Sequence, residues 1–252
     1  TRTRMSFELA ANRLSADVVS FQSSISSLQK GESLQDTVYT LNAMGIDLYC
    51  IRHSSPGSPH LVNKYSGKPV INGGDGRHSH PTQALLDIFS IWEKLGDLKG
   101  LKITIVGDIL NSRVVRSNLI GMGKLGAKVT VCGPKTLMPG NMESVYDCRV
   151  EYDLPRALKD ADVVMGLRMQ LERMTEGLFP SLEEYSKHYV LSKETLKYAK
   201  RNALIMHPGP MNRGVEILPE IADSNQSVIV EQVANGVAVR MALMFLILGG
   251  KA

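Results

Sequence analysis

The sequence predicts an α/β protein of two doubly wound domains with mainly parallel sheets, joined by long helices. Strand-like and helix-like segments alternate along most of the chain, the order that parallel sheets require. The 252 residues suffice for two domains of about 125 residues, each with its own core. A break at residues 96–100 separates two such series. We therefore expect one domain over residues 1–95 and 236–252, and the other over residues 96–235.

The composition excludes several classes of protein. Hydrophobic residues make up 43% and charged residues 21%, which is typical of a globular protein. The net charge of +4 is too small to indicate binding to nucleic acid or to a membrane surface. The apolar run 241–248 is too short to span a bilayer and predicts the buried face of a closing helix. Three widely spaced cysteines without a CxxC pair, two of them in expected buried strands, predict reduced thiols and a cytoplasmic protein: Cys50, Cys132 and Cys148.

The first series of elements opens with a helix, because Phe7, Ala10, Ala11 and Leu14 share one helical face. Thr1 and Thr3 are its candidate N-cap residues. We expect the remaining elements to be a short strand at 18–21, a helix at 33–44, buried strands at 47–52 and 70–72, a glycine-rich loop at 73–76 and an amphipathic helix at 80–95.

The second series has the same alternation. We expect strands at 102–106, 128–132, 162–167 and 203–206, and helices at 112–125, 154–159, 192–199 and 235–248. Residues 121–126 match the GxGxxG pattern of dinucleotide-binding proteins. That pattern must follow a strand and open a helix, whereas here it ends a helix and precedes a strand. It therefore predicts helix termination.

Charged and hydroxyl side chains gather where ligands bind in open α/β sheets, beyond the carboxyl ends of strands. The segment Thr1-Arg2-Thr3 at a helix start is suited to phosphate, although a plain N-cap with a solvated arginine is an alternative. Arg52 and His53 end a strand, and this pair either faces a ligand or keeps the loop soluble.

His80 begins the long amphipathic helix, and the positive end of the helix dipole should lower its pKa. A neutral imidazole can donate a hydrogen bond to a substrate carbonyl. The alternatives are a helix-capping histidine, or a metal pair with His78. Because no carboxylate or cysteine cluster completes a ligand set, we expect no metal.

Three further loops hold candidate residues. Arg113 stands at a helix entrance, and Arg168 and Gln170 follow a strand in a segment suited to a small dicarboxylate. An amphipathic loop with an internal Glu172–Arg173 pair is the alternative. In the turn 207–214, prolines fix the backbone and leave carbonyl groups as acceptors, unless it is only a tight turn, with or without a cis bond.

These segments together resemble the aspartate/ornithine carbamoyltransferase family. Its motifs occur in the family's order over essentially the whole chain: TRTR at 1–4, QKGE at 29–32, RH at 52–53, HPTQ at 80–83, GDxxxSR at 107–113, RxQxER at 168–173 and HPxP at 207–210. The RxQxER segment and the HPGP turn resemble the members that act on aspartate. The ornithine members carry a Ser-Met-Gly type segment and a His-Cys-Leu-Pro turn, which this chain lacks.

The resemblance implies transfer of the carbamoyl group of carbamoyl phosphate to the amine of L-aspartate, in pyrimidine biosynthesis and without a cofactor. It implies that Thr1, Arg2 and Thr3 hold the phosphate and that Thr3, Arg52 and His80 polarise the carbonyl. Gln83 and a carbonyl of the turn Pro208-Gly209-Pro210 would bind the amide, and Arg113, Arg168 and Gln170 would hold aspartate. Lys30, beside Ser26 or Ser27, would serve the active site of a neighbouring subunit, which implies a homotrimer.

Three alternatives stay open. An NAD-dependent dehydrogenase shares the doubly wound pattern, but its glycine fingerprint is not in the right place. An ornithine-type or other carbamoyltransferase, or an inactive binding protein with this fold, shares most of the motifs. The chain opens inside the TRTR motif, without the serine that precedes it in the family, so we expect the natural protein to begin earlier.

Overall fold

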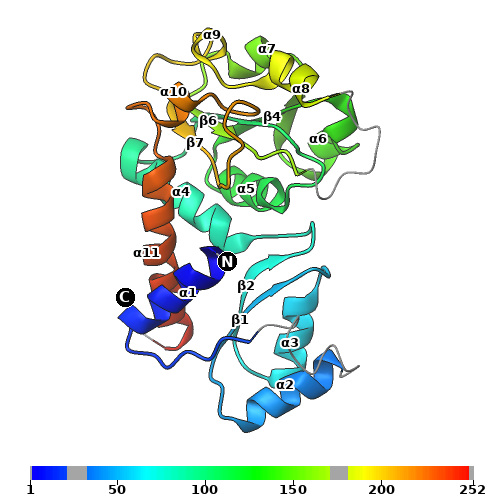
Figure 1. Cartoon of the computed structure of the whole chain (residues 1–252), viewed down its shortest axis with the longest axis vertical. Helices are drawn as coiled ribbons and strands as arrows, with labels where there is room; N and C mark the ends of the chain where they lie inside the picture. Colours follow the sequence, from blue (N-terminus) through cyan, green and yellow to red (C-terminus); the bar gives the residue numbers. More distant parts are fainter. Residues whose placement is uncertain (1, 22–32, 171–180, 250–252) are drawn as a thin grey trace. The chain divides into compact units, whose positions relative to one another are not determined.

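The computed structural model describes residues 2–21, 33–170 and 181–249. The chain divides into two compact units, which we describe separately: unit 1 consists of Thr1–Thr82 and Gly236–Ala252, and unit 2 of Gln83–Asn235. Two helices pass from one unit to the other, α4 (Pro81–Leu95) and α11 (Ile229–Ile247) (Figure 1). The boundary expected from the sequence, at residue 96, lies at the other end of α4.

Unit 1 is built around two parallel strands, β1 and β2, whose carboxyl ends lie together because His53 pairs with Asp75. Helix α3 packs against both strands, and α2 packs against α3 (Figure 1). The elements of this unit, besides the parts of α4 and α11 that belong to it, are α1 (Arg2–Arg13), α2 (Leu34–Ala43), β1 (Tyr49–His53), α3 (Ser58–Ser66) and β2 (Val70–Asp75).

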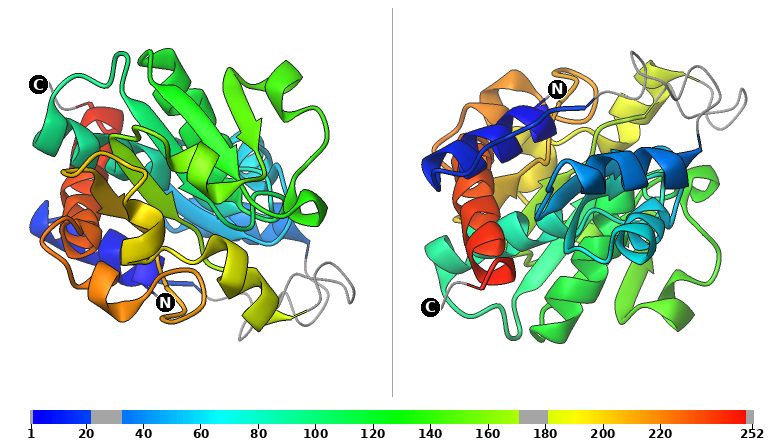
Figure 2. Two further views of the ribbon diagram at one scale, coloured as in Figure 1. Left: turned by 90° about the horizontal axis from the view of Figure 1, so that it is seen from above. Right: turned by 90° about the horizontal axis from the view of Figure 1, so that it is seen from below.

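The core of unit 1 joins segments from opposite ends of the chain. Phe7 and Ala10 of α1 pack with Ile71 of β2 and with Val237 and Met244 of α11. The guanidinium of Arg240 lies 4.9 Å from the centre of the Phe7 ring, a cation–π contact inside this core. Figure 2 shows α1, in blue, crossing α11, which is drawn in orange to red.

Unit 2 contains a five-stranded parallel sheet with the order β5-β4-β3-β6-β7. The chain starts in the centre, winds outward to one edge and then returns to build the other, which is the doubly wound topology. Its elements are β3 (Lys102–Val106), α5 (Arg113–Lys124), β4 (Lys128–Cys132), η3 (Lys135–Leu137), α6 (Met142–Val145), β5 (Cys148–Glu151), α7 (Leu154–Leu158), β6 (Val163–Gly166), α8 (Leu182–Tyr189), α9 (Lys193–Leu196), β7 (Leu204–Met206) and α10 (Pro219–Ala222).

Each face of this sheet has its own hydrophobic core, because successive side chains of a strand point to opposite faces. Ile103 and Ile105 of β3 pack with Leu119 of α5 on one face. Val106 of the same strand packs with Leu158 of α7 on the other. Figure 1 shows α5 on one side of the sheet, and α7 and α9 on the opposite side.

Two expectations about the start of the chain are wrong. Residues 18–21 form no strand, and Val18, Val19 and Phe21 are exposed. A strand requires a partner for its backbone groups, and this segment pairs with none in the part of the chain that the structure describes. Thr3 is not an N-cap residue, since α1 already begins at Arg2.

Other expectations are corrected in detail. Gly73 to Asp75 belong to β2 and not to a loop. Strand β1 is only partly buried, and Cys50 is exposed, because its side of the alternating strand is not covered by the core. Helix α11 begins at Ile229 rather than at residue 235. Six elements were not predicted: α3, η3, α6, β5, α8 and α10. The GxGxxG segment does end a helix, since α5 stops at Lys124.

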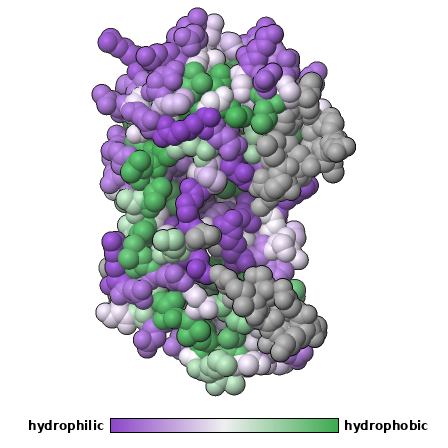
Figure 3. Space-filling model, viewed as in Figure 1, coloured by the Kyte–Doolittle hydropathy of each residue, from purple (hydrophilic) through white to green (hydrophobic). Residues whose placement is uncertain are grey.

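Helix α11 is the one helix among the described residues that is long and apolar enough to cross a membrane. A helix that lies in the core of a protein can have the same length and composition. Ile229 lies in a core of unit 2, and Val237 and Met244 lie in the core of unit 1. Figure 3 shows hydrophobic surface along the edge where α11 lies in Figure 1, and its exposed residues include Val230 and Val233.

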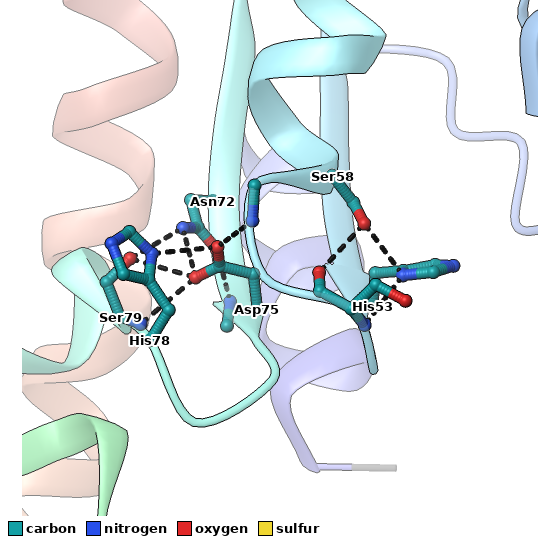
Figure 4. Close-up of polar contacts among 9 residues, drawn as sticks. His53, Ser58, Asn72, Asp75, His78 and Ser79 are labelled. Atoms are coloured by element: carbon teal, nitrogen blue, oxygen red, sulfur yellow. Dashed lines mark hydrogen bonds and ion pairs between the residues drawn. The ribbon is translucent and has the colours of Figure 1, made fainter.

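The loops that follow β1 and β2 are tied together by the buried carboxylate of Asp75 (Figure 4). Its oxygens accept hydrogen bonds from the Gly57 N–H at 2.8 Å, from Asn72 Nδ2 at 2.9 Å and from the Ser79 N–H and Oγ at 3.0 and 2.9 Å. His78 Nδ1 lies 2.9 Å from Asp75 Oδ2. Burial alone would raise the pKa of Asp75, but the hydrogen bonds outweigh burial and hold its pKa well below the ordinary value.

The depressed pKa predicts how Asp75 contributes to stability. A carboxyl group whose pKa is lower in the folded than in the unfolded chain stabilises the fold above its unfolded pKa of about 3.9. This contribution is lost as the pH falls toward the folded pKa. The wild-type chain should therefore unfold at higher urea concentration than Asp75→Asn at neutral pH, and the difference should shrink below about pH 4.

The matched control is Asp47→Asn, a change at an exposed side chain of the same unit. Urea titrations followed by circular dichroism between pH 7 and pH 3 measure both differences. A difference for Asp75→Asn that stays constant over this range, or that matches the one for Asp47→Asn, would contradict the assignment.

Candidate active site

In unit 1, the structure brings Thr3 and Arg52 together. Arg52 Nη1 donates a hydrogen bond of 2.6 Å to Thr3 Oγ1, so the start of α1 contacts the end of β1. Gly73 allows β2 to pack closely against β1, because a Cβ atom there would lie only 3.2 Å from the Ile51 carbonyl oxygen. Arg2 is exposed on the first turn of α1.

The turn after Arg52 is fixed by His53 (Figure 4). The Ser55 N–H donates to His53 Nδ1 at 2.9 Å, so the proton of the neutral ring is on Nε2. Ser58 Oγ lies 2.8 Å from the same nitrogen and donates to the Ser55 carbonyl at 2.8 Å. His53 thus organises the loop that leads into α3.

His80 is buried, with 5% of its surface exposed, and directly precedes α4. Thr82 Oγ1 lies 3.5 Å from His80 Nδ1, at the limit of a hydrogen bond. The neighbouring His78 contacts Asp75. In the described residues, no group of three or more His, Cys, Asp or Glu side chains is arranged to hold a metal ion.

In unit 2, Arg113 and Arg168 follow adjacent strands at the same edge of the sheet, since Val106 of β3 pairs with Gly166 of β6. Gly107 allows the segments that follow β3 and β6 to approach each other closely. Its φ is +137°, and a Cβ atom there would lie 2.8 Å from the Leu167 carbonyl oxygen. Arg113 is the first residue of α5 and is 7% exposed.

The loop between β3 and α5 is held by its own side chains. The buried carboxylate of Asp108 accepts hydrogen bonds from the Asn111 N–H at 3.0 Å and from Asn111 Nδ2 at 3.1 Å. Ser112 caps α5 by accepting from the Val115 N–H. This places Arg113 at the positive end of the helix, where an anion is favoured.

Arg168 and Gln170 flank Met169, which is fully buried against Leu137 and Tyr185. The buried methionine anchors this segment, and the two polar residues on either side are partly exposed. The remainder of the RxQxER segment, residues 171–173, lies outside the described residues, as do Thr1, Ser26, Ser27 and Lys30.

The turn after β7 is held by the buried side chain of His207. The Gly209 N–H donates to His207 Nδ1 at 2.9 Å, so Nε2 carries the proton and faces Glu216 Oε1 at 3.4 Å. Glu216 also accepts from the Asn212 N–H. Gly209 has a φ of +61°, and the Gly209–Pro210 bond is cis. The hydrogen bonds to His207 and Glu216 hold the backbone that carries the Pro208 and Gly209 carbonyl groups.

Sequence reasoning missed the residues that support Gln83 and this turn. Gln83 Nε2 donates to Asp87 Oδ1 at 2.9 Å, and Gln232 Nε2 donates to the same oxygen at 2.9 Å. The spacing of Gln83 and Asp87, four residues apart on one helix, was a usable signal. Gln232 carried no such signal, because it lies before the residue at which the last helix was expected to begin.

Comparisons with known proteins agree with this arrangement. The family model for the aspartate/ornithine carbamoyltransferase carbamoyl-P binding domain matches residues 1–93, and that for the Asp/Orn binding domain matches residues 99–247. The aspartate carbamoyltransferase catalytic subunit of Moorella thermoacetica is 57% identical over 250 residues, which are 99% of this chain and 81% of that protein. The corresponding subunit of Roseiflexus sp. is 55% identical over 254 aligned positions, which cover 99% of this chain and 79% of that protein.

Solved structures give the same result. The ornithine carbamoyltransferase from Pyrococcus furiosus is 32% identical with a TM-score of 0.87, covering 100% of this chain and 82% of that one. The aspartate transcarbamoylase from Trypanosoma cruzi in complex with N-(phosphonacetyl)-L-aspartic acid is 27% identical with a TM-score of 0.86, covering 100% and 80%. Because two family models match most of its length and a relative is 57% identical over 99% of the chain, the chain belongs to the aspartate/ornithine carbamoyltransferase family.

Proposed function

We propose that this chain is an aspartate carbamoyltransferase, which joins the carbamoyl group of carbamoyl phosphate to the amine of L-aspartate in pyrimidine biosynthesis. The observation that carries the proposal is the 57% identity, over 99% of the chain, to a protein named as the catalytic subunit of that enzyme. The products are N-carbamoyl-L-aspartate and phosphate. Arginines at the strand ends supply the charge that two anionic substrates require.

Carbamoyl phosphate is assigned to two groups of residues. Thr1, Arg2 and Thr3 hold its phosphate at the start of α1, where a helix favours an anion. Arg52, Thr3 and His80 donate hydrogen bonds to its carbonyl oxygen. The 2.6 Å contact of Arg52 with Thr3 supports the assignment, because it places a guanidinium and a hydroxyl side by side.

The amide end of carbamoyl phosphate and the second substrate are assigned to other residues. The two N–H groups of the amide need two acceptors, which Gln83 and the carbonyl of Pro208 or Gly209 supply, with Pro210 completing the turn. L-Aspartate is assigned to Arg113, Arg168 and Gln170. The support is chemical, since guanidinium groups bind carboxylates through paired hydrogen bonds.

The reaction requires no cofactor in this proposal. The aspartate amine attacks the carbonyl carbon, and negative charge develops on the carbonyl oxygen of a tetrahedral intermediate. Donors aimed at such an oxygen are worth about 2.7–4 kcal/mol each. The bond between carbon and the phosphate oxygen then breaks, and the departing phosphate takes the proton that the amine loses. Orientation of the two substrates lowers the barrier further.

The assembly is assigned by resemblance alone. Lys30 would act in the active site of a neighbouring copy of the chain, which makes a homotrimer the smallest complete unit. A cytoplasmic location fits reduced cysteines, of which Cys132 is fully buried in the sheet of unit 2.

The reaction itself is tested by a colorimetric assay for N-carbamoyl-L-aspartate. We expect product from carbamoyl phosphate with L-aspartate, and none of the corresponding product with L-ornithine. The identity to the P. furiosus ornithine enzyme makes L-ornithine the necessary comparison. Tight binding of a bisubstrate analogue without turnover would instead indicate an inactive binding protein.

His80→Ala should lower kcat at least tenfold, with only a modest change in the affinity for carbamoyl phosphate. The reason is that His80 donates to an oxygen whose negative charge develops during the reaction. Steady-state kinetics with saturating aspartate measure the change. His60→Ala, on an exposed side chain of α3, is the control. An unchanged kcat would remove His80 from the chemistry.

Arg168→Ala should mainly raise the KM for aspartate, by about tenfold or more, because a hydrogen bond to a charged group contributes about 1.5–3 kcal/mol. Kinetics at varied aspartate and saturating carbamoyl phosphate measure the effect. Arg201→Ala, at an exposed arginine of unit 2, is the control. If only the affinity for carbamoyl phosphate fell, the assignment of Arg168 to aspartate would be wrong.

A further inference from the structure

The interior of unit 2 contains a polar cluster that touches both proposed acceptors for the carbamoyl amide. Asp87, Asn118, Gln232 and His207 are each at most 2% exposed, and Gln83 is 9% exposed. These five residues come from α4, α5, α11 and the turn after β7. Most buried polar groups are hydrogen-bonded, and the hydrogen bonds that these residues make define the orientation of their side chains.

A backbone N–H group determines which atoms of this cluster donate and which accept. The His207 N–H donates to Gln232 Oε1 at 2.9 Å. A backbone N–H can only donate, so Gln232 must present its oxygen to His207 and its nitrogen to the other side. There Gln232 Nε2 donates to Asp87 Oδ1 at 2.9 Å.

Asp87 in turn determines the orientation of the Gln83 amide. Its Oδ1 accepts from Gln232 Nε2 and from Gln83 Nε2, while Oδ2 accepts from Asn118 Nδ2 at 2.9 Å. An ionised carboxylate only accepts hydrogen bonds. The amide of Gln83 must therefore turn its nitrogen toward Asp87, which leaves its oxygen on the opposite side.

We propose that Asp87 is a positioning residue that fixes the polarity of the Gln83 amide, so that Gln83 Oε1 accepts a hydrogen bond from the NH2 group of the carbamoyl substrate. This inference rests on the proposed function. The same cluster holds the second acceptor, because His207 directly precedes Pro208 and its backbone N–H is anchored by Gln232. The preference of Gln83 and this turn for an amide over a methyl group thus depends on Asp87 and Gln232, which do not touch the substrate.

The cluster also predicts which substitution is tolerated. In Asp87→Asn, the Gln232 nitrogen still demands an acceptor, so the new amide places its oxygen toward Gln232 and Gln83. Its nitrogen then faces Asn118, whose buried Oδ1 has no hydrogen-bond partner and can accept after the Asn118 amide turns over. Asp87→Ala provides no acceptor, and the Gln83 amide is then free to turn.

The test compares two stable phosphonates that differ only in the group on the carbonyl carbon. Phosphonoacetamide carries NH2 at that position, and acetonylphosphonate carries a methyl group. Isothermal titration calorimetry of the full chain gives the ratio of the two affinities. We expect the wild-type chain to bind phosphonoacetamide more tightly than acetonylphosphonate. Asp87→Ala should lower the ratio of the two affinities about fivefold or more, and Asp87→Asn should keep most of it.

Asn118→Ala is the matched control, because it removes a fully buried member of the cluster without touching the contacts of Gln83 and Gln232. It should keep the wild-type ratio even if it lowers stability. The proposal is overturned if Asp87→Ala keeps the ratio, or if Asn118→Ala or Asp87→Asn loses as much as Asp87→Ala. A wild-type chain without any preference would instead count against the proposed function.

Discussion

The common constraint in this protein is that parallel strands in register end at the same edge of a sheet. In unit 1, His53 pairs with Asp75, so the residues that follow β1 and β2 are neighbours. In unit 2, Val106 pairs with Gly166, so the loops after β3 and β6 are neighbours as well. Crossover helices carry the chain back each time, which leaves those edges to polar loops. The topology therefore gathers the motif residues that end or follow these strands within each unit, among them Arg52 in unit 1 and Arg113 and Arg168 in unit 2.

Buried carboxylates then fix the shape of these loops. Asp75, Asp108, Asp87 and Glu216 each accept hydrogen bonds from N–H groups of nearby loops, helices or amide side chains. An acceptor with two oxygens can hold several donors at set angles, so one such residue defines a whole turn. The proposed substrates are anions. The four buried carboxylates hold the protein's own loops and side chains in place, whereas Arg52, Arg113 and Arg168 lie at or after the ends of strands.

Periodicity predicted the sheet of unit 2 well. The strands at 102–106 and 128–132 were expected with the bounds that the structure has, because a buried strand between two helical layers is a continuous apolar run. The edge strand β5 was missed, since it is short and contains Arg149 and Glu151. Residues 18–21 had strand composition but no pairing partner in the described chain, and pairing is not encoded locally.

The sequence motifs identified the candidate side chains but not the residues that hold those side chains in place. Arg52 and Thr3 were both named from the sequence, whereas their contact depends on a fold that joins residues 49 positions apart. The Asp87–Gln232 pair joins residues 145 positions apart, and a single sequence gives no sign of it. Residues that contact a ligand form motifs that can be recognised in the sequence. The residues that orient those side chains can be identified only from the folded structure.

The return of α11 to unit 1 has a consequence for biosynthesis on the ribosome. Val237 and Met244 fill the core around Phe7, and Arg240 covers its ring. Unit 2 is one continuous stretch of chain and can form as soon as it has emerged. Phe7 and Ala10 emerge before α11 and lack these packing partners until α11 has been translated. A nascent chain thus carries an incomplete unit 1 while the whole of unit 2 is being synthesised, and exposed apolar side chains in that interval are what a chaperone would bind.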